Sequence, residues 1–317
     1  MKLIAFLVST IRFGMTLLFG STGETITEKS GHLNLGIPGV MCVGAACGCF
    51  AASKYYYATG GNLVPVLAVI IPIIATFIGA ALVGLLYSFF TVTLRANQNV
   101  TGLVITTLGV GISEFMIAKL KAESFASASK FFTAPLPFAS KLGWFGELFL
   151  SYGIMIYLAI AVAIATSIIF NKTKIGLHLR AVGETPATAD AAGINVALYR
   201  YAATCIGCGI SGLGGLTFIM DYLYGNWEYT IDAIGWLCVA LVIFTVWRPG
   251  FGIFCSIIFG AFYVMSEYID LGLAAKEIFK MLPYIVTIVV LVFTSIRNRK
   301  ENQHPAGLGL NYYREER

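Results

Sequence analysis

Residues 175–195 read IGLHLRAVGETPATADAAGIN and form the one long polar interruption in a chain that is otherwise almost entirely apolar. Hydrophobic runs flank this stretch on both sides, at residues 149–170 and 201–220. The densest internal cluster of basic residues lies between the two runs: Lys172, Lys174, His178, Arg180 and Arg200. Because the cytoplasmic loops of membrane proteins carry an excess of Lys and Arg, the segment is predicted to lie in the cytoplasm between two spans.

The middle of this segment predicts a short helix. Thr185 is a suitable N-cap, and Pro186 occupies the first helical position, where proline is favoured. Residues 187–192 are rich in helix-forming alanine, and Gly193 is positioned to end the helix. A short rigid helix between two spans is suited to being pushed by another protein. The simpler alternative is an ordinary capped connector, which the loop chemistry alone favours.

The composition is typical of a polytopic membrane protein. Of 317 residues, 58% are hydrophobic and 12% charged, whereas soluble domains contain about 25% charged residues. The net charge of +5 does not indicate a nucleic-acid partner, because the basic residues lie at the ends of predicted spans without interleaved aromatic residues. The seven cysteines all fall in apolar segments, where we expect small hydrophobic side chains rather than disulfides.

The hydrophobic runs predict an all-α fold of about 8–10 transmembrane helices in a single domain, residues 1–317. The run at residues 3–19 is interpreted as a retained span, because Arg12 would interrupt the apolar core of a signal peptide. The glycine-rich residues 36–52 are short for a crossing and predict a half-span or broken helix. Residues 64–94 exceed the roughly 20 residues of a crossing and predict a tilted or extended helix.

The positions of the basic residues predict the orientation of the chain. The loop at residues 171–200 and the tail at residues 297–317, which begins Arg-Asn-Arg-Lys, are both predicted to be cytoplasmic. About four crossings lie between them, as two cytoplasmic ends require. Residues 121–147 and 221–232 predict outer loops, and residues 247–250 a tight inner turn. Counting crossings backwards from the cytoplasmic loop places the N-terminus outside the cell. Lys2 favours a cytoplasmic N-terminus, so one early segment is a candidate for a re-entrant segment that does not cross the membrane.

The sequence contains no constellation that indicates an enzyme. The three histidines are scattered, and none lies at metal-ligand spacing from Cys, Asp or Glu. A nucleophile elbow, an HExxH motif and a Walker A motif are all missing. Residues 207–212 match GxGxxG but lie within an apolar span, where close helix packing explains the glycines better than pyrophosphate binding. We therefore expect no catalytic residue, no metal and no cofactor.

Three stretches carry a recognisable pattern in a fixed order. Residues 27–39 read TEKSGHLNLGIPG, with Gly44-Ala45 after them; residues 95–103 read RANQNVTGL, followed by LGVG at 108–111. The third is the polar stretch itself, followed by SGLGG at residues 211–215. Together they resemble the permease subunits of ABC importers, in the branched-chain amino acid and simple sugar permease group, and the nucleoside-type and sugar-type members are the most similar.

The resemblance implies a role for the cytoplasmic helix. In such permeases this helix docks in a groove of the ATPase subunit and transmits its closure to the spans. Carried onto this chain, the ATPase-coupling candidates are Arg180, Gly183, Glu184, Pro186, Ala189, Asp190 and Gly193. Small alanines allow close docking, and carboxylates can pair with basic groups of a partner, although a solvated loop face explains the charges as well.

The resemblance also implies the partners and the location. It implies a transport subunit in the cell membrane, with ATP hydrolysis left to a separate ABC ATPase. A second permease subunit, forming a heterodimer, and an extracellular or periplasmic solute-binding protein complete the expected assembly. The C-terminus is expected in the cytoplasm.

Nucleosides are the first substrate choice by this resemblance, simple sugars the second and branched-chain amino acids the third. Residues 243–244 are Ile-Phe where the family often has a glycine, so packing around the pathway is expected to differ. Candidate pathway residues that can hydrogen-bond a ribose are Asn34, Asn97, Asn99, Thr106 and Thr107, although helix capping or interhelical bonding explains them equally. Outside the family, the alternative is an ion-coupled secondary carrier, which the scarcity of acidic residues in the spans disfavours.

Overall fold

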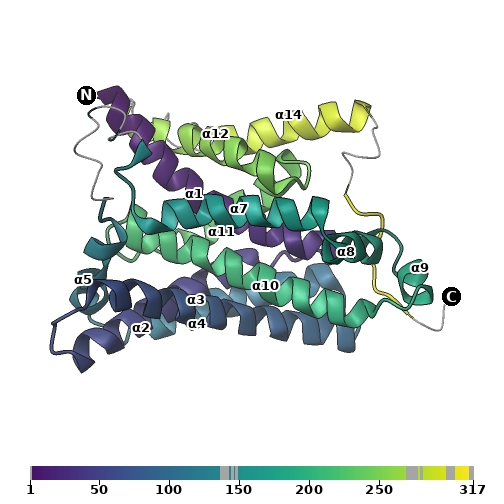
Figure 1. Ribbon diagram of the computed structural model, residues 1–317, viewed down its shortest axis with the longest axis horizontal. Helices are drawn as coiled ribbons and strands as arrows, with labels where there is room; N and C mark the ends of the chain where they lie inside the picture. The colour runs from purple at the N-terminus through teal and green to yellow at the C-terminus, as the bar shows by residue number, and fades with distance from the viewer. Residues whose placement is uncertain are drawn as a thin grey trace.

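The computed structural model describes residues 2–135, 143, 146, 149–268, 278, 281–297 and 304–313. Among these residues there are helices and irregular segments but no strand. Most of the long helices lie side by side along the long axis of the molecule, as Figure 1 shows. They are α1 (Lys2–Lys29), α2 (Ile37–Ala58), α3 (Pro65–Ser88), α4 (Gln98–Ile117), α7 (Ile154–Lys172), α10 (Val196–Thr217), α11 (Ile231–Phe244), α12 (Pro249–Tyr268) and α14 (Leu282–Arg297).

The prediction of an all-α polytopic membrane protein is confirmed. In the part of the chain that the structure describes, 6 helices are long and apolar enough to cross a membrane, and α11 and most of α12 form shorter apolar helices. With α14 these make nine apolar helices, within the predicted range. The N-terminus and α5 (Ala122–Phe132) lie at one end of the bundle, and α8 (Lys174–Glu184) and α9 (Pro186–Ala191) lie at the other (Figure 1).

The prediction of a half-span or broken helix at residues 36–52 is wrong. α2 is a continuous helix of 22 residues, which corresponds to a length of about 33 Å and suffices for a crossing. Its side chains are mostly small and apolar, so α2 is buried along most of its length between α3, α4 and α10. A shorter segment is predicted because the polar Lys54 and the tyrosines that follow are interpreted as the end of the span.

α1 is also longer than its hydrophobic run. It runs for 28 residues from Lys2 to Lys29 and carries the polar residues Glu24 and Glu28 inside the bundle. Both carboxylates are buried and make hydrogen bonds, Glu24 with the Asn34 amide and Glu28 with the Trp247 indole. Tertiary partners therefore allow the helix to extend through polar residues.

The helix predicted from residues 64–94 is confirmed as longer than one crossing. α3 continues without interruption into a π-helical turn, η1 (Phe89–Thr93), so that 29 residues from Pro65 to Thr93 form one apolar helix. Arg95 ends it with a positive φ of 55°. The inner turn predicted at residues 247–250 joins α11 to α12, and Val246 and Trp247 adopt positive φ there.

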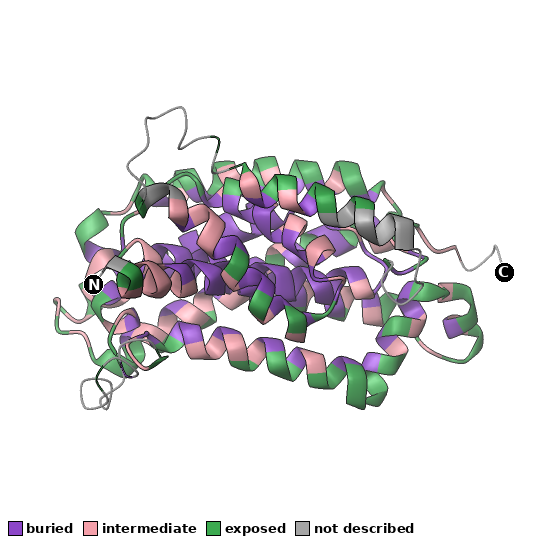
Figure 2. Ribbon diagram, turned by 90° about the horizontal axis from the view of Figure 1, so that it is seen from above, coloured by how far each residue is buried: buried purple, intermediate pink, exposed green. Residues whose placement is uncertain are grey.

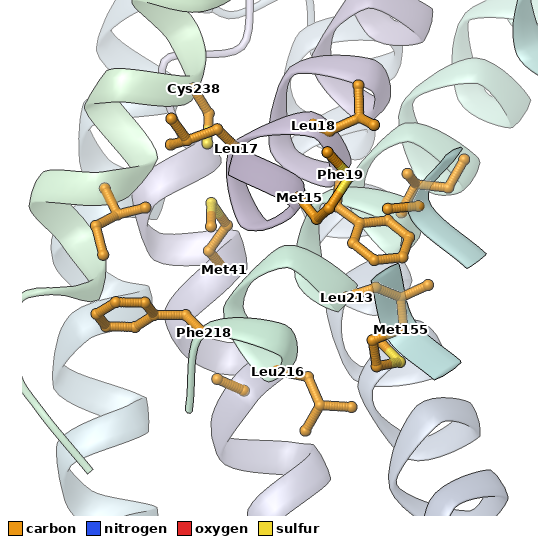
Figure 3. Close-up of a cluster of buried hydrophobic side chains, with 14 of the residues drawn as sticks. Met15, Leu17, Leu18, Phe19, Met41, Met155, Leu213, Leu216, Phe218 and Cys238 are labelled. Atoms are coloured by element: carbon orange, nitrogen blue, oxygen red, sulfur yellow. The ribbon is translucent and has the colours of Figure 1, made fainter. Parts of the chain in front are cut away.

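The buried core runs along the centre of the bundle (Figure 2). α10 packs on α1, α2 and α3. In the close-up of Figure 3, side chains of α1 gather with those of α2, α7, α10, η3 (Phe218–Tyr222) and α11; the labelled residues are Met15, Leu17, Leu18, Phe19, Met41, Met155, Leu213, Leu216, Phe218 and Cys238. A continuous apolar contact surface of this kind fixes the relative positions of the central helices.

The glycines of the GxGxxG match serve helix packing, as predicted. A Cβ on Gly207 would lie 2.5 Å from the carbonyl oxygen of Gly23 on α1. A Cβ on Gly44 of α2 would lie 2.7 Å from the Cα of Gly212. Backbones approach this closely only where both helices lack side chains, which is the small-residue packing of membrane helices.

The outer helices expose large apolar side chains. On α3, exposed residues recur at helical spacing and form a stripe: Ile70, Ile74, Ile78, Leu82 and Leu86. In Figure 2 the exposed residues lie mainly on the outside of the bundle and the buried ones within. Contiguous apolar surface of this extent is unfavourable in water and suits the hydrocarbon of a bilayer.

Candidate functional site

The polar stretch that interrupts the hydrophobic runs folds into two short helices at one end of the bundle, which we call the α8–α9 end. α8 begins after Thr173, whose hydroxyl accepts a hydrogen bond from the Gly176 amide at 3.2 Å. Four residues of α8 are buried, namely Gly176, Leu179, Val182 and Gly183, and the others lie on the outside or are half-buried. This helix was missed in the sequence, although the spacing of these buried positions is the signal that could have revealed it.

The predicted helix at residues 185–193 is confirmed as α9. Thr185 is its N-cap residue and Pro186 its first residue, but the Thr185 hydroxyl makes no capping hydrogen bond. Gly193 adopts a φ of +85°, and the amides of Gly193 and Ile194 donate to the carbonyls of Asp190 and Ala189, each at 3.0 Å. This pattern is a Schellman motif, which ends a helix sharply and favours glycine at this position.

The structure divides the predicted coupling residues into outward-facing and inward-facing groups. Arg180, Glu184 and Gly193 are exposed, and Pro186 and Asp190 are half-buried. By contrast, Gly183 and Ala189 are buried against the rest of the protein. The seven residues therefore lie in one small region but do not form one docking surface.

Gly183 lies where α8 contacts the end of α1. A Cβ at this position would lie 2.3 Å from the carbonyl oxygen of Lys29, so only glycine fits without a backbone shift. The carbonyl of Gly183 also accepts a hydrogen bond from the Gly307 amide at 2.9 Å. This glycine thus connects α8 to α1 and to the C-terminal segment.

The C-terminal residues 304–313, which we call the tail segment, cover this end of the bundle. The Ala306 amide donates to Glu184 Oε2 at 3.1 Å, and the Tyr312 hydroxyl donates to Asp190 Oδ2 at 2.7 Å. The Gly309 amide donates to the Gly31 carbonyl at 3.2 Å. No pattern in the sequence indicates these contacts, since the tail segment is polar and distant in the chain from its partners.

The tail segment also contacts the loop between η1 and α4. Asn311 Nδ2 donates to the carbonyl of Arg95 at 2.7 Å, and Gln98 Nε2 donates to Asn311 Oδ1 at 3.3 Å. The Arg95 guanidinium lies over the ring of Tyr313, with its carbon 4.7 Å from the ring centroid. One segment therefore joins α8, α9, the loop after α1 and the start of α4.

A polar hollow of 580 Å³ opens between α7, α8 and the turn before α12. Its lining includes three basic side chains, Lys29, Arg180 and Arg248, and the carboxylate of Glu184. Trp247 borders the hollow, and its indole N–H donates to Glu28 of α1. The end of α1 thus contacts both α8 and the α11–α12 turn.

Among the pathway candidates, Asn34 is fully buried at the junction of α1, α2 and α10. Its backbone amide donates to Glu24 Oε1 at 3.2 Å, its Oδ1 accepts from the Gly36 amide at 2.9 Å, and its Nδ2 lies 3.4 Å from Cys208 Sγ. The neighbouring His32 Nδ1 lies 3.1 Å from Thr204 Oγ1. These bonds shape the loop between α1 and α2.

The other four pathway candidates do not converge with Asn34. Asn97 is the N-cap of α4 and accepts from the Val100 amide at 3.1 Å, and Asn99 is exposed. Thr106 donates to the carbonyl of Leu35 at 2.9 Å, and Thr107 donates to Leu103 within its own helix at 3.2 Å. Thr107 lines an open apolar groove of 770 Å³ on the outer face of α4. Capping and interhelical bonding thus account for most of these polar groups, and their role in the pathway stays a prediction.

Comparisons with known proteins extend over most of the chain. Residues 6–291 match the family model described as branched-chain amino acid transport system / permease component. The nucleoside ABC transporter permease protein NupC of Lactococcus lactis is 30% identical over 291 residues, which cover 88% of each chain. The putative glucose ABC transporter permease protein TsgC13 of Haloferax volcanii is 30% identical over 337 residues, which cover 97% of each chain. The guanosine ABC transporter permease protein NupQ of Bacillus subtilis is 29% identical over 291 residues, which cover 89% of each chain.

Proposed function

Since this chain belongs to the family of branched-chain amino acid transport system permease components, we propose that it is the permease subunit of an ABC importer that carries nucleosides across the membrane. The observation that carries the substrate is the similarity to the nucleoside permease NupC and the guanosine permease NupQ along nearly the whole chain. ATP hydrolysis belongs to a partner ABC ATPase, as in other permeases of the family. The chain itself is a transport subunit.

We propose that the α8–α9 end is the surface on which the ATPase acts. Arg180, Glu184, Pro186 and Gly193 are accessible or partly accessible there. Gly183 and Ala189 pack inward and transmit the movement instead of receiving it. Two routes support transmission: α8 contacts α1 through Gly183 and Lys29, and α9 leads through a three-residue link into Asn195, the N-cap of α10. Both α1 and α10 are central helices, so a push at this end reaches the core of the bundle.

The orientation of the chain follows from the same placement. The α8–α9 end holds the basic residues Lys172, Lys174, Arg180, Arg200 and Arg248, and the positive-inside rule supports the proposal that this end faces the cytoplasm. The tail segment contacts this end and is proposed to be cytoplasmic with it, and the N-terminus, at the opposite end of the bundle, is proposed to lie outside. A solute-binding protein would then meet the end that carries α5, and a second permease subunit would complete a heterodimer.

Uptake of labelled guanosine or inosine, compared with labelled ribose, tests the proposed substrate. Cells with and without the gene are compared, and ATP is depleted in a parallel sample while ion gradients are held. We expect nucleoside uptake that requires both the gene and ATP. Uptake that follows ion gradients and ignores ATP would contradict an ABC importer and favour a secondary carrier.

A sugar is the second candidate substrate, because TsgC13 is similar to this chain over 97% of its length and its name describes a putative glucose permease. The same uptake experiment separates the two. Loss of ribose or glucose uptake with unchanged nucleoside uptake in cells without the gene would assign the chain to sugars.

A further inference from the structure

A second hollow at the α8–α9 end lies apart from the one lined by Lys29 and Arg248. It has a volume of 210 Å³ and lies between the end of η1, α9, the start of α10 and the tail segment. The polar side chains that line it are Thr91, Arg95, Asp190, Asn195, Arg200 and Tyr312. We call it the Arg200 hollow.

Arg200 is a buried cation with unused hydrogen-bond donors. Its exposed fraction is 2%, and its Nε and Nη2 atoms have no hydrogen-bond partner. No carboxylate of the described residues forms an ion pair with it. The one carboxylate in the hollow, that of Asp190, accepts the hydroxyl of Tyr312 at 2.7 Å. Because a buried guanidinium is costly unless its donors are satisfied, this side chain calls for an acceptor in the hollow.

The start of α10 supplies a second, independent feature. Asn195 caps this helix by accepting the Leu198 amide at 3.0 Å. Val196 and Ala197, in the first turn, also line the hollow, and amides at this position have no carbonyl partner within the helix. The N-terminal end of a helix of 22 residues therefore presents amides and a positive dipole end to the same space.

The charge and size of the hollow indicate the class of ligand. Two arginines and one aspartate line it, which gives a net charge of +1, so an anion is favoured. A guanidinium and the amides of a helix start together match the oxygens of a phosphate group. A volume of 210 Å³ accommodates that group and the atoms next to it, while the rest of a larger molecule would extend through the opening.

We propose that the Arg200 hollow binds a phosphate group, held by the guanidinium group of Arg200 and by the first amides of α10, with Arg95 as a second cation. The group belongs either to a free phosphorylated compound or to the headgroup of an anionic lipid. Because Asp190 of α9 and Tyr312 of the tail segment line the same hollow, the bound group fixes the coupling helix and the tail against α10.

Binding of inorganic phosphate to the full chain in nanodiscs of phosphatidylcholine tests the site. The readouts are broadening of the ³¹P resonance of inorganic phosphate and the shift of Tm at constant ionic strength, neither of which depends on the transported solute. We expect phosphate to raise Tm and to give a broadened resonance, whereas chloride at the same ionic strength gives no stabilisation. The absence of both effects with phosphate, together with no effect of lipid, would overturn the proposal.

The variant Arg200→Met removes the proposed anchor, and Lys174→Gln is the matched control, because Lys174 is an exposed basic residue of α8 that lies outside the hollow. We expect phosphate affinity to fall at least about tenfold in R200M, with Tm no longer responding to phosphate, and to be unchanged in K174Q. If R200M does not fold, the variant R95Q is measured instead. Phosphate affinity that is several-fold weaker in R95Q supports the site, and unchanged phosphate affinity refutes it.

Nanodiscs that contain phosphatidylglycerol separate the two sources of the phosphate group. A lipid headgroup predicts a higher Tm in anionic nanodiscs without added phosphate, an increment that R200M loses and K174Q keeps. A free compound predicts stabilisation by soluble phosphate in either lipid. The proposal would be overturned if phosphatidylglycerol raised the Tm of R200M and K174Q equally and soluble phosphate changed neither. General surface charge would then explain the increase in Tm.

Discussion

At the scale of single residues, Glu184, Asp190 and Gly183 at the α8–α9 end make contacts that their side-chain chemistry alone does not predict. Glu184 and Asp190 read as charges for a partner protein, yet both accept hydrogen bonds from the tail segment. Gly183, a coupling candidate in the sequence, is a tight packing position inside a helix. Sequence reasoning selected a region, and the structure adds the contacts that each of its side chains makes.

Gly183→Ala is expected to weaken the joint between α8 and α1. The added Cβ would lie 2.3 Å from the carbonyl oxygen of Lys29, so the two backbones must separate. We expect a loss of about 1–3 kcal/mol in the free energy of unfolding and reduced ATP-dependent uptake. The measurements are Tm of the purified chain and initial uptake rate.

The matched control is Gly111→Ala in α4. A Cβ there meets no atom within 4 Å, and the residue lies inside a helix, so this change should leave Tm the same or slightly higher. Equal Tm values for the two variants would show that the contact of Gly183 with Lys29 does not constrain α8.

At the scale of elements, the connection between α7 and α10 consists of two helices held from both sides. α9 ends in a Schellman motif at Gly193, and α8 begins at a side-chain cap from Thr173. The capped ends and the contacts with the tail segment restrict the movement of α8 and α9 relative to the bundle. Stiffness is what transmission of a push requires, because a flexible loop would absorb the movement.

Gly193→Pro and Glu184→Arg are expected to abolish ATP-driven uptake while the chain still inserts into the membrane. Proline cannot adopt the φ of +85° at residue 193, and it removes the amide that donates to Asp190. Arginine at residue 184 reverses the charge and removes the acceptor of the Ala306 amide. Uptake and the amount of protein in the membrane fraction are measured together.

Ala192→Ser is the control for these variants, because Ala192 is exposed next to Gly193 and has an ordinary backbone conformation. It should transport normally. Full ATP-dependent uptake in both G193P and E184R would show that this end does not couple the permease to an ATPase.

At the scale of the whole molecule, the helices alternate in direction, so that α8, α9 and the tail segment lie at one end and the N-terminus at the other (Figure 1). This arrangement agrees with the predicted number of crossings between the N-terminus and α8, and an N-terminus outside the cell, against the mild indication of Lys2, stays a prediction. α2 makes a full crossing, and no re-entrant segment is needed to explain the order of the described helices.

Cysteine labelling tests the proposed orientation. Thr188→Cys on α9 and Tyr229→Cys at the opposite end place exposed thiols at the two ends, whereas the native cysteines are buried or half-buried. In intact cells, a membrane-impermeant maleimide should label Y229C, and T188C should react only after permeabilisation. The parent chain measures background labelling, and the reverse pattern would invert the topology.

The sequence by itself determined the fold class, the positions of most spans, the helix between Pro186 and Gly193, and the family. These features follow from local signals: the length of an apolar run, the identity of a cap, and motifs that stay together along the chain. Each of these signals involves residues close together in the chain, so the features can be predicted without knowledge of distant contacts.

The tertiary structure decided the features that depend on residues far apart in the chain. α1 extends through Glu24 and Glu28 because α2 and the turn at Trp247 supply donors. The tail segment donates hydrogen bonds to the carboxylates of Glu184 and Asp190. Arg200 is buried near it, and its Nε and Nη2 atoms have no hydrogen-bond partner. The cost of burying a polar group depends on the partners that folding brings to it, and no local pattern in the sequence specifies those partners.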